Sequence, residues 1–378
     1  MKQVLVLGAG MVGRTIALDL SSDCAVTAAD RSVENLSKLP DAIHKLQIDV
    51  KDEVAFKEAV RKFDLVIGAV PGFLGFQTAR QVIEAGKNLV DISFFAENAF
   101  DLDDLARRKR VTAVVDCGVA PGLGNIILGY WNKRMNIESF VCYVGGLPTV
   151  RTYPFEYKSP FSPIDVIEEY TRPARLMENG NLVIKPALSE PEIVNFPEIG
   201  SLEAFNTDGL RSLLLTMKHI PNMKEKTLRY IGHREKIQFL LSAGFLSDNE
   251  MTLHGVKLKP KEMTSKILFE AWRLEENEEE FTVLKLEMIG NQNGKRKVVQ
   301  YELLDRTDHD AKQSSMSRTT GFTCTAVARL VLSGKYKRKG ISPPEYVGEN
   351  KACFEFILQA LEQRQVQLRS HSLTTTRH

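Results

Sequence analysis

The sequence predicts an α/β protein that begins with a doubly wound parallel sheet and continues into a second, mixed α/β domain. Three observations support this. Short apolar runs alternate with amphipathic stretches over about the first third of the chain, a glycine-rich turn joins the first two of these segments, and the alternation stops beyond residue 121. Regular alternation of strands and helices favours a parallel sheet with helices on both faces.

The first turn has the glycine spacing of a dinucleotide-binding loop. Val4 to Leu7 is apolar, glycines follow at GxGxxG spacing, and residues 11–20 are amphipathic. In this arrangement Gly8 makes the tight turn, Gly10 lets the backbone approach a pyrophosphate, and Gly13 lets the helix pack on the strand. We therefore predict a Rossmann half-domain. The predicted cofactor-binding residues of the turn are Gly8, Gly10, Met11, Val12 and Gly13.

Asp30 indicates which dinucleotide binds. It ends the apolar run 24–30, 17 residues beyond Gly13, near the expected place for an acid that holds the ribose hydroxyls. A carboxylate there repels a 2′-phosphate, which favours NAD over NADP. Arg31 follows and could instead serve a 2′-phosphate or stack on adenine. We predict NAD as the cofactor.

The alternation continues after Asp30. We expect strands at 42–48, 64–70, 88–92 and 111–116, and helices at 51–62, 75–85 and 102–110. Ligands of such sheets bind at the carboxyl ends of the strands. Taken alone, a residue in one of these turns more often has only a structural role. Because all of these turns lie at the same edge of the sheet, we interpret them as one wall of the cofactor-binding site. The cofactor-binding residues predicted there, besides Asp30 and Arg31, are Asp49, Val50, Val70, Pro71, Asp91 and Ser93.

The rest of the chain is less regular. A helix is expected at 123–134, a Pro- and aromatic-rich loop at 147–163, and a strand at 227–231. Asn291 to Gly294 predicts a hairpin between alternating runs at 280–289 and 297–305. Helices are expected at 321–332 and 351–366, and residues 370–378 are expected to be disordered. The predicted domains are 1–121, 122–315 and 316–378, the last returning to the first.

Composition excludes several classes of function. The net charge of +2 gives no electrostatic case for nucleic acid or a membrane surface, and no apolar run could span a bilayer. The N-terminus enters a strand at once, which leaves no room for a signal peptide. The five scattered cysteines favour reduced thiols in a cytoplasmic protein, and no metal-ligand cluster is visible.

Several segments together resemble the saccharopine dehydrogenase family, and most closely its lysine 6-dehydrogenase branch. The matching segments are GAGMVG at the first turn, 91–93, 117–122, 155–163, 202–209, 227–233 and 315–321. The resemblance covers nearly the whole chain in order. It implies a substrate domain inserted before C-terminal helices that return to the nucleotide domain, and homodimers formed through the substrate domain.

One departure from the family favours a particular substrate. Saccharopine-forming members are similar at Gly-Val-Ala-Pro-Gly but carry an acid where Ala120 stands, and the lysine 6-dehydrogenases resemble this chain there. The resemblance thus implies NAD-dependent oxidative deamination of the ε-amino group of L-lysine. The product would be the 6-semialdehyde, which cyclises to piperideine carboxylate, with release of ammonia.

This reaction requires three kinds of side chain. Arg229 is our candidate for holding the substrate α-carboxylate, because guanidinium binds carboxylate bidentately. His233 is the candidate base that deprotonates the substrate ammonium, because imidazole has a suitable pKa. Each could instead be structural. Tyr153, an alternative acid or pocket residue, completes the predicted catalytic set, and candidate acids for the α-ammonium are Glu156, Asp165 and Asp208.

Two alternatives stay open. A saccharopine or carboxynorspermidine type of NAD(P) reductase would need further carboxylate-binding cations, and Arg151, Arg172 and Arg175 are available. A non-catalytic NAD-binding sensor would have no need of the matched substrate-domain segments.

Overall fold

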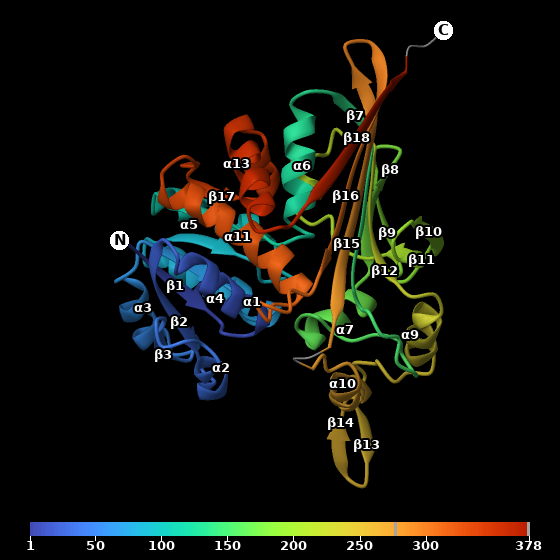
Figure 1. The fold of residues 1–378 in the computed structure, drawn as a ribbon. Helices are drawn as coiled ribbons and strands as arrows, with labels where there is room; N and C mark the ends of the chain where they lie inside the picture. The colour runs from blue at the N-terminus through green and yellow to red at the C-terminus, as the bar shows by residue number, and fades with distance from the viewer. Residues whose placement is uncertain (276–277, 376–378) are drawn as a thin grey trace. The chain divides into compact units, whose positions relative to one another are not determined.

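The computed structural model describes residues 1–275 and 278–375, which fold into two compact units (Figure 1). The first unit comprises Met1–Ile137, Asn291–Gly294 and Met316–Leu368. The second unit comprises Glu138–Gly290, Lys295–Ser315 and the C-terminal residues from Arg369.

The first unit is built on a seven-stranded parallel sheet in the order β17-β6-β5-β4-β1-β2-β3. Its strands are β1 (Lys2–Leu7), β2 (Cys24–Asp30), β3 (His44–Gln47), β4 (Leu65–Gly68), β5 (Asn88–Asp91), β6 (Thr112–Val114) and β17 (Gly340–Ser342). The helices are α1 (Met11–Leu20), α2 (Val33–Ser37), α3 (Glu53–Val60), α4 (Gly72–Glu84), α5 (Asp103–Arg108), α6 (Leu123–Asn132), α11 (Ser315–Leu332), α12 (Pro344–Gly348) and α13 (Lys351–Glu362), with a short 3₁₀ turn at Ala99–Leu102. The predicted doubly wound sheet is confirmed.

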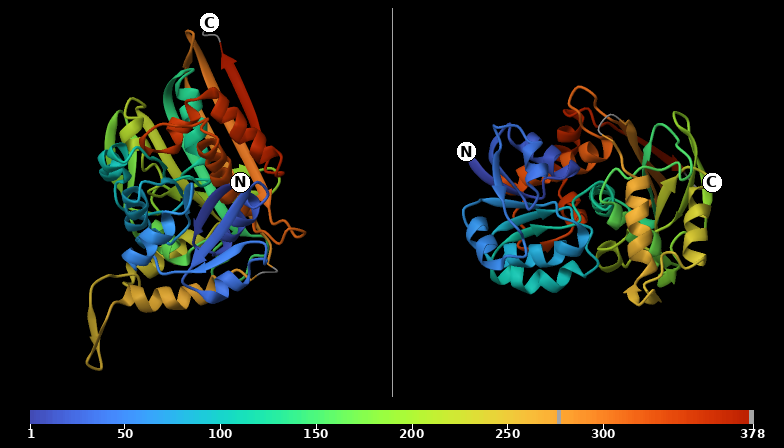
Figure 2. Two further views of the ribbon diagram at one scale, coloured as in Figure 1. Left: turned by 90° about the vertical axis from the view of Figure 1, so that its left-hand side faces the viewer. Right: turned by 90° about the horizontal axis from the view of Figure 1, so that it is seen from below.

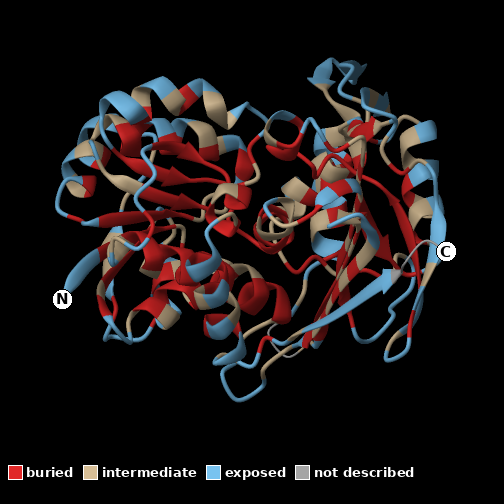
Figure 3. Ribbon diagram, turned by 90° about the horizontal axis from the view of Figure 1, so that it is seen from above, coloured by how far each residue is buried: buried red, intermediate tan, exposed pale blue. Residues whose placement is uncertain are grey.

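Burial explains why the strands of this sheet are uniformly apolar. Val4–Leu7 of β1 and all of β4 are buried, and Figure 3 shows the central strands in red between partly exposed helices. A parallel strand covered on both faces has no solvent-facing side, so its sequence is a continuous apolar run and does not alternate. The order of strands changes direction between β1 and β4, which is where such sheets bind ligands.

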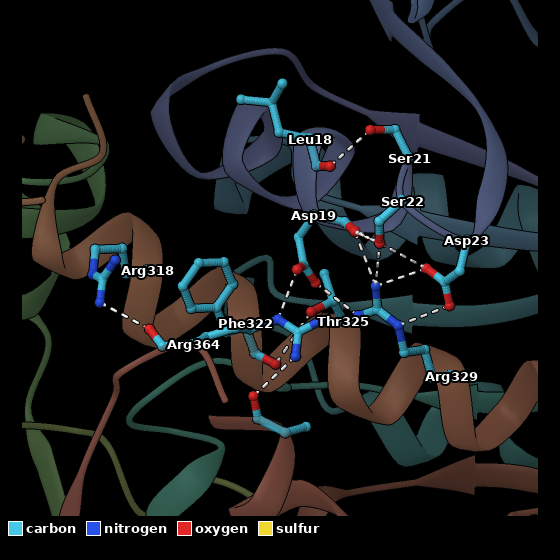
Figure 4. Close-up of polar contacts among 11 residues, drawn as sticks. Leu18, Asp19, Ser21, Ser22, Asp23, Arg318, Phe322, Thr325, Arg329 and Arg364 are labelled. Atoms are coloured by element: carbon cyan, nitrogen blue, oxygen red, sulfur yellow. Dashed lines mark hydrogen bonds and ion pairs between the residues drawn. The ribbon is translucent and has the colours of Figure 1, made fainter. Parts of the chain in front are cut away.

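A partly buried charge cluster joins α11 and the end of α13 to α1 (Figure 4). Asp19 accepts from Arg364 Nε at 2.6 Å and from Arg329 NH1 at 2.7 Å, and Arg329 also donates to Asp23. Burial by itself raises the pKa of Asp19, but hydrogen bonds from Arg364 and Thr325 and the charge of Arg329 outweigh it, so the pKa lies below its usual value. The cluster fixes the returning C-terminal helices within the first unit.

The second unit contains a mixed nine-stranded sheet whose main path is β10-β11-β12-β7-β15-β16-β18, with β8 and β9 joined to β12. Its strands are β7 (Asn136–Pro148), β8 (Ala174–Glu178), β9 (Asn181–Lys185), β10 (Glu192–Phe196), β11 (Gly200–Asn206), β12 (Asn222–Arg229), β15 (Glu280–Gln292), β16 (Lys295–Arg306) and β18 (Leu368–Thr375). Its helices are α7 (Pro163–Thr171), α8 (Leu213–Thr216), α9 (His233–Ser242) and α10 (Pro260–Ala271). A separate hairpin, β13 (Met251–Leu253) with β14 (Val256–Leu258), projects next to α10 (Figures 1 and 2). The predicted hairpin around 291–294 is confirmed as β15–β16.

The two faces of β12 meet different cores. Leu228 belongs to an apolar cluster that includes Phe281 and Val283 of β15. Arg229 points to the opposite face, where Tyr170 of α7 lies in a cluster with residues of α9 and α10. This alternation follows from the two-residue period of a strand.

The structure differs from the sequence-based expectations in three places. α6 belongs to the first unit and not to the second domain, because Gly129 and Gly348 let the backbones of α6 and α12 meet closely. Strand β17 was not expected. Residues 370–375, expected to be disordered, form most of β18, and residues 376–378 lie outside the described residues.

Candidate functional site

In the glycine turn after β1, side chains at two of the three glycine positions would overlap neighbouring backbone atoms. Gly8 has φ +96°, and a Cβ there would overlap the carbonyl oxygen of Ala69. A Cβ on Gly13 would overlap the carbonyl oxygen of Gly8, so this glycine is needed for the close approach of α1 to β1. Gly10 is exposed, and nothing lies within 4 Å of the position of its Cβ. The two glycines are required by packing, whereas Gly10 leaves open space beside the backbone.

The N-terminus of α1 is suited to an anion. Gly10 caps the helix in an extended conformation without a side-chain hydrogen bond, and the first turn contains no acid. Met11 and Val12, both half-buried, follow in that first turn. Backbone N–H groups at such a helix end, together with the helix dipole, attract the pyrophosphate of a dinucleotide. The open backbone and the donor groups therefore fit a dinucleotide.

Asp30 connects the end of β2 to this turn. Its Oδ2 accepts from Ala9 N–H at 2.8 Å and from Asn35 Nδ2 at 3.2 Å, while Oδ1 accepts from Ser32 N–H at 2.8 Å. A carboxylate oxygen accepts two hydrogen bonds, so Oδ1 retains capacity for a ribose hydroxyl. The Asp30 side chain is half-buried, and Arg31 beside it is exposed.

The next predicted residues lie at the same edge of the sheet. Asp49 is exposed and accepts from Lys51 N–H at 2.9 Å, and the carbonyl oxygen of Val50 accepts from the Gln81 side chain at 3.4 Å. Val70 is half-buried and Pro71 exposed, directly before α4. Because β4 is the neighbour of β1, the turn that contains Val70 and Pro71 borders the turn at Gly8.

Asp91 and Ser93, also predicted to bind cofactor, lie deeper. Both are buried, and Asp91 accepts from Ser93 N–H at 2.8 Å and from Ser93 Oγ at 3.2 Å. The Asp91 carboxylate lies over Gly68 of β4, where any Cβ would overlap it. These contacts fix the carboxyl end of β5, at the same edge of the sheet as the other predicted cofactor-binding residues.

The second unit brings Arg229 and His233 together through a residue that sequence reasoning missed. Arg229 is buried, and its Nε donates to Tyr170 Oη at 2.7 Å, NH1 to the carbonyl oxygen of Leu228 at 2.8 Å, and NH2 to Glu169 at 3.0 Å. The guanidinium carbon also lies 4.6 Å from the centre of the Tyr157 ring. Arg229 is therefore enclosed by groups of its own unit.

His233 has a partner on each ring nitrogen. Nδ1 lies 2.9 Å from the carbonyl oxygen of Phe155, which can only accept, so Nδ1 carries the proton. Nε2 then accepts from Tyr170 Oη at 3.0 Å, while that oxygen accepts from Arg229. The pKa of His233 is lowered to about 3, first by burial, with 1% of the residue exposed, and then by the charges of Arg229 and Lys236, while the hydrogen bond to the Phe155 carbonyl acts in the opposite direction. The histidine is neutral near pH 7.

Tyr153 does not join this network. It is 85% exposed in the loop between β7 and α7, whereas Tyr157, four residues on, packs against His233 with ring centres 5.0 Å apart. Glu169 and Tyr170 were missed because an acid and an aromatic residue inside a helix are common in any amphipathic sequence. Only their contacts in the three-dimensional structure distinguish these two residues from others of the same type in a helix.

Two negative findings apply to the described residues. No helix there combines the length and the apolar composition that a bilayer crossing requires. No group of three or more His, Cys, Asp or Glu side chains among them is placed to hold a metal ion.

Comparison with known proteins identifies both parts of the chain. Residues 4–114 match the family model of the saccharopine dehydrogenase NADP binding domain, and residues 118–366 match that of the saccharopine dehydrogenase C-terminal domain. Saccharopine dehydrogenase [NADP(+), L-glutamate-forming] of Pyricularia oryzae is 28% identical over 284 residues, which are 71% of this chain. The match spans 63% of that enzyme.

Solved structures share the fold. Apo saccharopine dehydrogenase (L-Glu forming) from Saccharomyces cerevisiae matches with a TM-score of 0.79 at 20% identity, covering 99% of this chain and 100% of that one. Homospermidine synthase from Legionella pneumophila, in complex with NAD, matches with a TM-score of 0.66 at 12% identity, covering 98% and 91%. The glycine turn lies within the segment that matches the NADP binding domain, so residues 4–114 form an NAD(P)-binding domain, and the two family models show that the chain belongs to the saccharopine dehydrogenase family.

Proposed function

We propose that this protein is an NAD-dependent oxidoreductase that removes the ε-amino group of L-lysine by oxidation. The observation that carries the substrate assignment is Ala120, in the loop 117–122 that follows β6 at the carboxyl edge of the parallel sheet. Saccharopine-forming members are expected to carry an acid at this position. A methyl group cannot organise the charged groups of a substrate as large as saccharopine, which favours the smaller amine.

The chemistry divides between cofactor and protein. When bound, the cofactor NAD would supply the hydride acceptor for the carbon that bears the amine, and water would hydrolyse the imine so formed to the semialdehyde and ammonia. The chain's own residues bind and orient. The N-terminus of α1 would hold the pyrophosphate, Asp30 would hold the ribose, and the loops after β4, β5 and β6 would line the remaining edge of the site.

The contacts of His233 and Arg229 support a positioning part for both residues. A neutral histidine with both nitrogens engaged is a poor proton acceptor, so we do not retain His233 as the base that deprotonates the substrate. The network instead stabilises the position of Glu169, whose side chain is 19% exposed and which accepts from Arg229 and from Thr227 Oγ1.

Asp30 supports NAD over NADP, although the Pyricularia relative is named for NADP. We expect Asp30→Ala to lower kcat/KM for NAD by roughly 10- to 100-fold, the equivalent of one lost hydrogen bond to a charged group. The value for NADP would stay the same or rise. The control is Asp41→Ala, an exposed acid paired with Lys45 in the same unit. An unchanged ratio of the two kcat/KM values would remove Asp30 from cofactor selection.

The substrate is tested by following NADH formation with L-lysine, saccharopine and carboxynorspermidine in one panel. A signal with lysine, and a cyclic imine as product, would support the proposal. A signal with saccharopine or carboxynorspermidine alone would keep the oxidoreductase and replace its substrate. No signal with any amine, with NAD still bound, would favour a sensor.

A second candidate is the saccharopine or carboxynorspermidine type of reductase, favoured by a group of arginines in the second unit. Arg175 forms a bidentate pair with Asp208, with both nitrogen–oxygen distances 2.8 Å. Arg172 lies near both, and burial first, then the charge of Arg211, lowers its pKa. Several cations at one place suit a substrate with more than one carboxylate. If the protein is a reductase of this type, Arg172→Met should raise the KM for saccharopine. If it is a lysine-oxidising enzyme, the same variant should leave lysine oxidation unchanged.

We also propose a homodimer. The family resemblance supports this proposal, and molar mass from light scattering after size exclusion tests it, with the 42.5 kDa of a single chain as the result that contradicts it.

A further inference from the structure

A buried acid lies close behind the loop at the end of β6. Glu345 is fully buried in α12, three residues after β17. Because β17 runs parallel to β6 and pairs with it, the carboxyl ends of both strands reach the same edge of the sheet. Topology therefore places α12 beside the loop 117–122.

Close helix packing brings the acid to the loop. A Cβ on Gly129 of α6 would overlap the backbone of Glu345, and one on Gly348 of α12 would overlap the backbone of Ile126. The two glycines allow the backbones of α6 and α12 to touch. At this separation a glutamate side chain can reach the first turn of α6.

A chain of two hydrogen bonds connects Glu345 to the loop backbone. Glu345 Oε2 accepts from Asn125 Nδ2 at 3.1 Å, and Asn125 Oδ1 accepts from Gly122 N–H at 3.2 Å. Gly122 has φ +141°, and a Cβ there would overlap Gly118 at the other end of the loop. The loop is closed by Gly118 N–H to Pro121 O at 3.1 Å and Leu123 N–H to Gly118 O at 2.9 Å.

A buried carboxylate is costly to keep unless it contributes something that an apolar residue cannot. We propose that Glu345 is a positioning residue. Through Asn125 it orients the Gly122 N–H and sets the shape of the loop 117–122, which borders the nicotinamide half of the cofactor. This inference rests on the proposed function, because in a doubly wound sheet one mononucleotide half lies over β1–β3 and the other over β4–β6.

The test compares three variants of the full-length protein. Glu345→Leu removes the acceptor at similar size, Glu345→Gln keeps an acceptor for Asn125, and Glu349→Leu is the matched control at the end of the same helix. Glu349 pairs with Lys133 at 3.4 Å and is partly exposed. The readouts are amide hydrogen exchange of the peptide over 117–126, the Kd for NADH from fluorescence, and kcat and KM with the amine.

For Glu345→Leu we expect exchange at Gly122 to be at least about tenfold faster and kcat at least about tenfold lower, because small displacements of positioning groups are costly in rate. The Kd for NADH should change less than about threefold, since the α1 turn and Asp30 hold the other half of the cofactor. Glu345→Gln should recover both exchange and kcat, and Glu349→Leu should match the unmodified protein.

Unaltered exchange and kcat in Glu345→Leu would overturn the proposal. A loss of kcat that follows the loss of folded protein, and that Glu345→Gln does not recover, would overturn it in favour of a purely structural role. If Glu345→Leu does not fold, Asn125→Ala repeats the test, because it removes both hydrogen bonds that connect Glu345 to Gly122. Hydrogen exchange reports on the loop even if no amine is oxidised, so failure of the proposed function remains distinguishable from failure of this inference.

Discussion

Acid should destabilise the second unit through His233, and the contacts of that residue give the size of the effect. The pKa of His233 is about 3 in the folded protein because burial, Arg229 and Lys236 disfavour its charged form. In the unfolded chain a histidine has a pKa of about 6.5. Between these two values the unfolded state binds a proton that the folded state does not, so stability is lost as the pH falls below about 6.5.

The magnitude follows from the two pKa values. Between pH 7 and pH 5, protonation of the unfolded state alone lowers the free energy of unfolding by about 2 kcal/mol for this one residue. Other groups titrate over the same range, so the comparison is between the unmodified protein and His233→Gln. We expect the unmodified protein to lose about 2 kcal/mol more than the variant over these two pH units, even though the variant is less stable at pH 7.

Urea unfolding followed by tryptophan fluorescence measures this difference. The chain has two tryptophans, and Trp272 lies in the second unit with its ring 6.2 Å from His233. A Trp131→Phe background therefore makes the signal specific to that unit. His371→Gln, at an exposed position on β18, is the control. Equal losses in His233→Gln and in the unmodified protein would refute the assignment of a neutral, enclosed histidine.

Three further predictions concern packing and charge. Gly13→Ala should abolish NAD binding or folding of the first unit, whereas Gly10→Ala should raise the Kd for NAD without loss of secondary structure. Calorimetry measures the Kd of each variant, and circular dichroism measures its secondary structure. Asp19→Ala should lower the free energy of unfolding by about 2–3 kcal/mol, because the partly buried Arg364 loses the carboxylate that accepts from its Nε, while Arg329 keeps its pair with Asp23. Asp23→Ala, which removes a side chain that is 49% exposed, should lower it by at most about 1 kcal/mol, and both values are measured by unfolding in urea. Arg229→Lys should lower it by about 2–3 kcal/mol, since an ammonium cannot replace the fork that contacts Tyr170 and the strand backbone; an unchanged urea midpoint would contradict this.

Sequence reasoning predicted the parallel sheet because its determinants are local. A buried parallel strand is a continuous apolar run, and the glycines of the first turn are required by contacts within a few residues or with the adjacent strand. The place of Asp30 at the end of β2 could be predicted because its distance from Gly13 is set by the length of one helix and one strand. The parallel sheet and its glycine turn are therefore largely predictable from the sequence, while the cofactor-binding roles of the individual residues stay predictions.

The features that the sequence did not predict depend on contacts between residues that are far apart in the chain. β17 is three residues long, too short to show a period, and exists because Ile341 pairs with Ala113 more than two hundred residues earlier. β18 is polar because it is an edge strand, so it has no apolar face to detect. Tyr170 acquires its importance from Arg229 and His233, which are about sixty residues away in sequence. A contact between residues so far apart produces no local pattern in the sequence.

The interrupted path of the chain has a consequence for biosynthesis. The first 137 residues of the first unit leave the ribosome long before β17 and α11–α13, which complete it. Until residue 342 has been synthesised, β6 is an unpaired edge of the growing sheet, open to association with other chains. The second unit in turn receives its edge strand β18 only once residues 368–375 have been synthesised. A nascent chain of this protein therefore carries two incomplete sheets for most of its synthesis, so its yield in a cell should depend strongly on chaperones that shield exposed strand edges.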